Sequence, residues 1–186
     1  MGLLTDPAAR ASSMSDLGVL HVGMRQFRKA EEAFATALEI QKKIAKTAQD
    51  SYQIDVAKTL VDVSSLYYET LRLPEAEQAL IEALSIYRRL SKANVQAVPP
   101  HLAATLDNLG LIYSDTGRHP KAEESFREAL DIRRKLAEAD SWGYLPAVAT
   151  TLSNFAIHYF KTKEVTQAEQ MFEEALAIRR ALAEIS

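Results

Sequence analysis

The strongest constraint on the fold of this 186-residue chain is that its sequence repeats every 46 residues. Alanine recurs at that interval in two registers, and leucine and isoleucine each recur in one. The four registers are Ala30, Ala76, Ala122 and Ala168; Ala37, Ala83, Ala129 and Ala175; Leu38, Leu84, Leu130 and Leu176; and Ile40, Ile86, Ile132 and Ile178. One residue type kept over four copies predicts four tandem structural units.

Each unit contains two segments with the spacing of an amphipathic helix. In the third unit, apolar or small residues at helical spacing define the first segment, at Leu106, Leu109, Gly110 and Tyr113. The second segment opens with acidic residues and continues to basic ones. We expect Arg133 and its neighbour Arg134 to end that helix and to complement its dipole.

Proline and glycine mark where these helices begin and end. Pro100 and Pro146 share a register that predicts the start of a first helix, and Pro74 and Pro120 do the same for a second helix. Gly117 suits the left-handed residue that follows a helix. The short connections that remain predict antiparallel hairpins.

The sequence therefore predicts an all-α protein, a right-handed α-solenoid of four helix-turn-helix units. The expected helices lie at roughly residues 7–23, 27–48, 53–71, 74–93, 100–116, 120–139, 146–162 and 165–184. The units lie at about residues 8–53, 54–99, 100–145 and 146–186, in a single array over residues 1–186 that can also be a piece of a longer one. Stacking is required because one hairpin cannot bury its own apolar face.

The repeat resembles the tetratricopeptide repeat. The family pattern W-x2-L-G-x2-Y followed by A-x3-F is met, apart from its tryptophan, by Leu106, Leu109, Gly110, Tyr113, Ala122 and Phe126, and the other three units match in phase. The period is longer than the usual 34 residues, and the stretches "ATLDNLGLIY" and "EALDIRRKLAE" are similar to the kinesin-light-chain-like subtype. That resemblance implies a scaffold that binds a protein or peptide segment in a concave groove.

Composition argues against several other functions. The net charge of -3 argues against a nucleic-acid binder, and the lack of a long apolar stretch argues against a membrane protein. The chain has no cysteine, and its four histidines form no metal-ligand motif. No cofactor-binding loop or nucleophile motif is present. We therefore expect a cytoplasmic protein that is not an enzyme and carries no cofactor or metal.

The first helices should line the groove, one step around from their core stripe. The candidate peptide-groove residues are Asp62, Tyr68, Glu69, Asp107, Asn108, Leu111, Asp115, Asn154, Ile157 and Phe160. Their acids predict a partner segment that carries basic as well as apolar residues. Asn108 and Asn154 share a register, and their amides could bind a ligand's main chain, whereas Asp16 and Asp62 take that register in the first two units.

Two further residues carry expectations. Gly110 shares a register with Gly18, Ser64 and Ala156, which predicts close packing between the two helices of each hairpin. Trp142 lies between repeats, and we expect it to pack on the preceding long helix, with a partner anchor as the alternative.

Two other functions remain open on the sequence. The array could be a structural module that stacks end to end or forms a homodimer through its uncapped ends. It could also be the sensor region of a larger signalling regulator.

Overall fold

The computed structural model describes residues 6–46, 50–93 and 97–184, and every regular element in these residues is an α-helix. The elements, in chain order, are α1 Pro7–Gly23, α2 Phe27–Ala45, α3 Asp50–Glu69, α4 Leu73–Lys92, α5 Val98–Asp115, α6 His119–Ala139, α7 Ser141–Lys161 and α8 Val165–Ala183. The predicted helices are confirmed, most of them to within three residues at each end.

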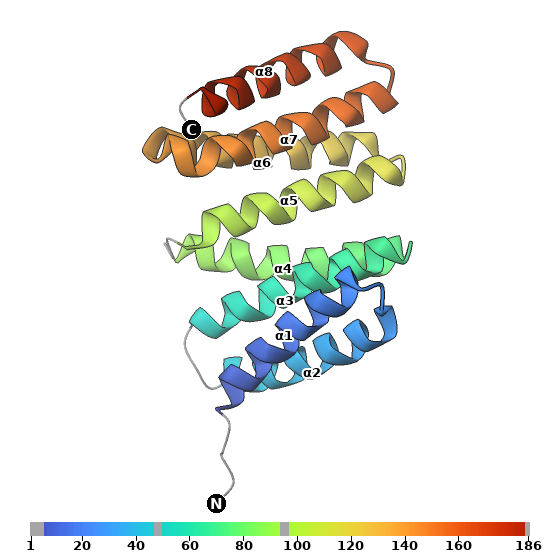
Figure 1. Cartoon of the computed structure of the whole chain (residues 1–186), viewed down its shortest axis with the longest axis vertical. Coiled ribbons are helices and arrows are strands. Elements are labelled where there is room, and N and C mark those ends of the chain that lie inside the picture. The colour runs from blue at the N-terminus through green and yellow to red at the C-terminus, as the bar shows by residue number, and fades with distance from the viewer. Residues whose placement is uncertain (1–5, 47–49, 94–96, 185–186) are drawn as a thin grey trace, which may run out of the picture. The chain divides into compact units, whose positions relative to one another are not determined.

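The chain divides into two structural units, Met1–Val95 (unit 1) and Gln96–Ser186 (unit 2). Each unit contains two helical hairpins (Figure 1). In unit 1, α1 pairs with α2 and α3 with α4, while α3 contacts both helices of the first hairpin. Unit 2 repeats this arrangement, with α7 in contact with α5 and α6. In both units, the first helix of the second hairpin therefore completes the core of the hairpin before it.

The alanine registers lie where the two helices of a hairpin are closest. Ala30, Ala76 and Ala122 have no exposed surface, and Ala168 has 3%. Larger apolar side chains surround these contacts, such as Phe34 in unit 1. A side chain larger than alanine would separate the helices, which explains why the residue type is kept in all four copies.

All four hairpins turn in the same way. A residue with positive φ follows each first helix, namely Arg25, Leu71, Gly117 and Lys163, at φ angles of 55°, 59°, 73° and 65°. The next amide donates to a carbonyl five residues earlier, at 2.8 Å in every copy. This is the Schellman pattern of a helix end. The sequence analysis identified it only at Gly117, because the other three copies place larger residues there.

Two expectations about helix ends were wrong. α7 begins at Ser141 rather than near Pro146, because the Asp140 side chain accepts a hydrogen bond from the Gly143 amide at 3.0 Å and caps an earlier start. Pro146 therefore lies inside the helix. α6 ends at Ala139, as its predicted range of 120–139 has it, so the expectation that Arg133 ends this helix and complements its dipole was wrong.

Candidate functional site

The predicted groove residues lie on first helices, in α3 of unit 1 and in α5 and α7 of unit 2. Their environments differ widely. Tyr68 and Glu69 are exposed at the end of α3, Asp62 is half-buried in the middle of α3, and Asn108 and Leu111 are half-buried on α5. Within unit 2 the structure brings α5 and α7 into contact, so their predicted residues can be compared directly.

Asp107 is buried, with 4% of its surface exposed, and is not a surface charge. Its Oδ2 atom accepts hydrogen bonds from Arg133 Nη1 at 3.3 Å and from Asn154 Nδ2 at 3.0 Å. Burial raises the pKa of the Asp107 carboxyl, although the guanidinium beside it opposes that shift. The expectation that Asp107 attracts a basic ligand from the groove must therefore be corrected, since its charge is compensated inside the unit.

Arg133 is the side chain that holds this cluster together. Besides Asp107, its Nη1 atom donates to the Ala147 carbonyl at 3.0 Å and to the Thr151 hydroxyl. A guanidinium from α6 thus joins α5 to α7. The cluster also occupies the amide nitrogen of Asn154, so this residue is less available to a ligand than the sequence suggested.

Asp115 is the second predicted acid of unit 2. Its Oδ1 atom lies 2.5 Å from Nζ of Lys161, one repeat further along on α7. Because both side chains are partly exposed, the pair contributes little to stability. It does neutralise the charge that was expected to attract a basic ligand.

Several first helices carry exposed apolar side chains. Ile157 and Phe160 on α7 expose 43% and 67% of their surfaces. In the same registers, Val19 on α1, three repeats before Ile157, is 50% exposed, and Tyr68 on α3, two repeats before Phe160, is 37% exposed. Large apolar groups that the fold leaves in contact with water are typical of binding surfaces when they gather on one face.

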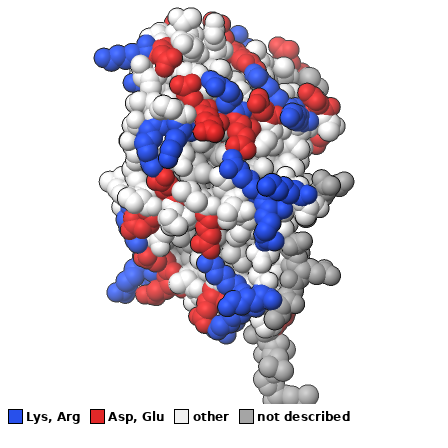
Figure 2. Space-filling model, turned by 180° about the vertical axis from the view of Figure 1, so that it is seen from behind, with Lys and Arg blue, Asp and Glu red and all other residues white. Residues whose placement is uncertain are grey.

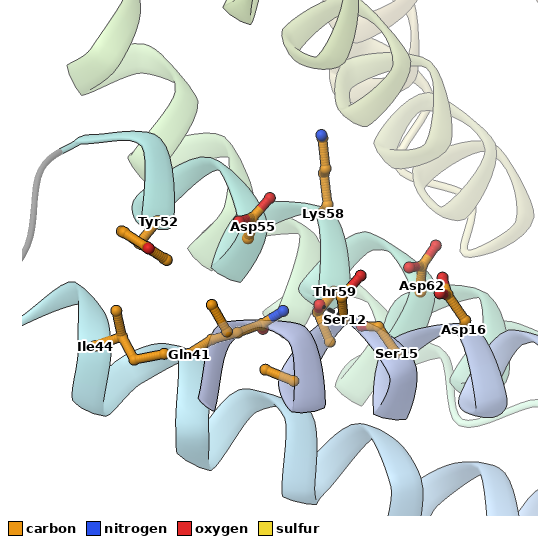
Figure 3. Close-up of a pocket in the computed structure, with 12 residues that line it drawn as sticks. Ser12, Ser15, Asp16, Gln41, Ile44, Tyr52, Asp55, Lys58, Thr59 and Asp62 are labelled. Carbon is orange, nitrogen blue, oxygen red and sulfur yellow. Dashed lines mark hydrogen bonds between the residues drawn. The ribbon is translucent and has the colours of Figure 1, made fainter. Parts of the chain in front are cut away.

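Unit 1 contains a pocket of about 270 Å³ between α1, α2 and α3 (Figure 3). Its lining is largely polar. The lining residues are Ala8, Ala11, Ser12, Ser15, Asp16, Gln41, Ile44, Tyr52, Asp55, Lys58, Thr59 and Asp62. The hydroxyls of Ser15 and Thr59 are 2.6 Å apart and hydrogen-bonded. Gln41 extends from α2 into this region and is only 5% exposed, and its Oε1 atom has no hydrogen-bond partner.

The pocket, from here on called the acidic pocket, is negatively charged. Asp16 of α1 and Asp62 of α3 lie beside each other at one end of it, and Lys58 extends away from them (Figure 3). Burial and, to a smaller extent, the charge of Asp16 raise the pKa of Asp62 to about 6, while Lys58 opposes the shift. Asp62 is therefore the predicted groove residue whose environment most favours a nearby cation.

Gln41 and Arg133 were not expected to contribute to a site. They occupy the same register as Tyr87 and Arg179, so the residue type at this position of the second helix changes along the repeats. Neighbouring registers keep one residue type in all four copies. That variation was the available signal. Trp142, expected to pack on the preceding helix, instead lies in the first turn of α7 with 54% of its surface exposed.

On the face shown in Figure 2, acidic and basic side chains are interspersed in small groups. Among the residues that the structure describes, no group of three or more His, Asp or Glu side chains is arranged to hold a metal ion. Within the same residues, no helix combines the length and apolar character that a membrane span requires.

Comparison with solved structures identifies proteins of the same fold. BtubC (BKLC) from P. vanneervenii superposes with a TM-score of 0.78 at 23% identity, over 98% of this chain and 68% of that one. The apo form of RapI gives 0.75 at 18%, over 94% and 44% of the two chains. A putative kinesin light chain from Podosopora anserina with nearly identical repeats gives 0.72 at 19%, over 99% and 81%. This chain thus spans less than half of RapI.

Sequence profiles identify the family. No curated protein matches this chain by sequence. Two profiles described as tetratricopeptide repeat match it, one at residues 55–135 and the other at residues 10–48 and 148–184. Together they cover most of the chain and leave no hairpin unmatched. With the all-α repeat fold and its kinesin-light-chain-like structural neighbours, these matches show that the chain belongs to the tetratricopeptide repeat family.

Proposed function

We propose that this chain is a protein–protein interaction scaffold that binds a partner segment along the exposed face of its first helices. The observation that carries the proposal is the exposure of Ile157 and Phe160 on α7. Phe160 leaves most of its surface in contact with water, and aromatic groups provide much of the binding energy at protein interfaces.

Polar groups on the same helices would orient the segment. Asn108, half-buried on α5, is the better candidate for binding a ligand main chain, because the Asn154 amide nitrogen already donates to Asp107. A segment bound to unit 2 should carry apolar residues, and a segment bound to unit 1 should carry a basic residue. In unit 1, the acids Asp16 and Asp62 lie together at the protein surface.

The test is a peptide-array screen of the wild-type chain and two variants. Phe160→Ala should weaken the strongest hits by about tenfold, which corresponds to the 1–2 kcal/mol expected for an aromatic anchor. Phe172→Ala is the matched control, because Phe172 is also exposed, at 43%, but lies on a second helix. Equal loss in both variants, or no loss in either, would contradict binding on the first helices.

A second candidate function is self-association through α8. Phe172 is 43% exposed and Leu176 is 46% exposed, whereas Phe126 and Leu130, one period earlier, are buried by α7. An apolar face of this kind is normally covered by the next hairpin of an array, and a second copy of the chain could cover it instead. Light scattering distinguishes the two functions: a dimer that Phe172→Glu dissociates supports self-association, and a monomer at all concentrations contradicts it.

A further inference from the structure

The acidic pocket of unit 1 occupies the same place in the repeat as the buried arginine cluster of unit 2. Ser15, Gln41 and Thr59 lie two periods before Asp107, Arg133 and Thr151, respectively. The remaining lining residues correspond in the same way, so that Asp62 is the counterpart of Asn154. Two sites built by one backbone arrangement therefore differ only in their side chains.

In unit 2 a guanidinium fills this place. Nη1 of Arg133 binds the carboxylate of Asp107, the carbonyl of Ala147 and the hydroxyl of Thr151. The arginine and the aspartate are 11% and 6% exposed, so the site is closed and its charges are compensated. The chain itself thus shows which group fits between a second helix and the two first helices that it contacts.

In unit 1 the place is open. Gln41 is shorter than arginine and Ser15 is smaller than aspartate, and the space that they leave is the pocket of about 270 Å³. The hydroxyl of the threonine is retained as Thr59. Gln41 Oε1 is buried and has no partner, which is costly for a polar atom that lies away from water. Asp107 Oδ1 in unit 2 is also buried without a partner, so the difference between the two sites lies in the cation and the open space.

Unit 1 also has acidic residues in this region, but at different positions of the repeat from Asp107 in unit 2. Asp62 and Asp16 stand where unit 2 has Asn154 and Asn108, and Asp55 also lines the pocket, against the single cation Lys58. In unit 2 the cluster contains its own cation. None of the residues that line the pocket in unit 1 is an arginine.

We propose that the acidic pocket binds the side chain of an arginine from the partner segment, whose guanidinium takes the place that Arg133 occupies in unit 2. This inference rests on the proposed function, because it names one residue that the bound segment carries. The acceptors are the Asp62 and Asp16 carboxylates and the hydroxyl of Thr59, and Gln41 lines the same space.

The chemistry of the pocket favours arginine over other ligands. A guanidinium has five N–H donors in a planar fork and can reach several acceptors at once, whereas an ammonium acts as a single point charge. An anion would be repelled by three aspartates. The pocket is also smaller than the roughly 300–1,000 Å³ of sites for drug-sized ligands, which suits one side chain.

The perturbed carboxyl gives independent support. The pKa of Asp62 is raised to about 6 by burial and by the charge of Asp16. A cation placed between these two groups would lower that pKa again, because it stabilises both carboxylates. A bound guanidinium would thus reduce the electrostatic repulsion between Asp16 and Asp62.

The first experiment uses no peptide. The full chain, labelled with 15N, is titrated with N-acetyl-arginine amide and, separately, with the lysine and citrulline analogues. We expect the arginine compound to shift the amide resonances of residues 8–16, 41–44 and 52–62, with citrulline inactive and lysine weaker by about tenfold. Equal responses to the arginine and citrulline compounds would show that the pocket does not recognise the positive charge. Equal responses to the arginine and lysine compounds would show that it does not prefer a guanidinium to an ammonium.

Three variants locate the binding. The double variant Ser15→Asp, Gln41→Arg copies the filled site of unit 2 and should abolish the response while keeping the helical circular dichroism spectrum. Asp62→Asn should weaken binding by about tenfold and keeps the inference testable if the double variant does not fold. Glu32→Gln removes the same charge from an exposed position on α2 outside the pocket and should leave binding unchanged.

The outcomes separate this inference from the proposed function. If the wild-type chain binds peptides that Phe160→Ala loses, but neither Asp62→Asn nor the filled variant alters the preference for arginine, only the inference fails. If the arginine compound binds the pocket but no array peptide depends on Phe160, only the proposed first-helix interface fails.

Discussion

The contact between Gly110 and Phe126 offers a strict test of how the hairpins are packed. A methyl group on the α-carbon of Gly110 would lie 2.6 Å from Cε1 of the Phe126 ring, well inside van der Waals contact. Gly18 meets Phe34 in the same way, at 2.5 Å. In the same register, Ser64 has Leu80 as its counterpart, and Ala156 has Phe172, which is 43% exposed rather than buried. Glycine thus accompanies the fully buried aromatic ring, and serine accompanies leucine.

The perturbation is therefore a double-mutant cycle that converts one pair into the other. The Phe126 ring is fully buried and stacks on Phe155 with a centroid distance of 5.3 Å, so it cannot move aside. Gly110→Ser should cost about 1–3 kcal/mol through overpacking, reduced by a few tenths through its better helix propensity. Phe126→Leu should cost about 1–2 kcal/mol, because it leaves part of the ring's space empty.

The double variant should cost less than the sum of the two, by about 1 kcal/mol or more, because it recreates the pair that unit 1 uses at Ser64 and Leu80. The free energy of unfolding is measured by urea denaturation of all four proteins, with circular dichroism at 222 nm and a common m-value. Gly23→Ser is a control for intrinsic propensity, since no atom lies within 4 Å of the added carbon. Costs that add to within about 0.5 kcal/mol would refute the argument that the glycine is required by the ring.

Three further outcomes are expected. Leu71→Gly should raise the free energy of unfolding by up to about 1 kcal/mol, because Leu71 has φ 59° and is 82% exposed; an unchanged thermal midpoint would contradict this. Arg133→Gln should destabilise by about 3–5 kcal/mol, since it leaves the Asp107 carboxylate buried without its cation; addition of Asp107→Ser should recover part of the loss in the same denaturation assay. Burial, reinforced by His119, lowers the pKa of His158, so the unfolded chain binds more protons below about pH 6.5. Stability should then fall from pH 7 to pH 5, less steeply in His158→Leu; identical slopes would rule out this role.

The fold was largely predictable because its signals are local and occur four times. Helical spacing, the buried alanines and the small residue at Gly110 each depend on neighbours within one hairpin. Four copies in phase therefore reinforce one another. The start of α7 was missed for a related reason: it rests on a single cap at Asp140, without a counterpart in the other units, and it competes with the proline signal at Pro146.

The candidate site was less predictable because its chemistry depends on side chains from three helices. Asp107 has the spacing of an exposed groove residue, and nothing in its own helix indicates that Arg133 reaches it from α6. The same holds for Asn154, which the ion pair draws inward. A pocket is harder still to predict, since it arises from missing volume. Gln41 becomes informative only when its register is compared with the arginine that fills the equivalent place.

The repeat allows positions that serve the fold to be separated from positions that distinguish one hairpin from another. Residues at the closest helix contacts, such as Ala30 and Ala122, keep their type because any larger group would separate two helices. In the register of Gln41 and Arg133, the first three copies are also buried, yet the residue changes in size, charge and hydrogen-bonding capacity. When the residue at a buried position changes, the residues around it must supply the partners that the new side chain needs, as Asp107 does for Arg133. In unit 1 the surroundings supply acids and an acceptor but no internal cation, and that incomplete match is the physical reason to expect the missing group on a partner.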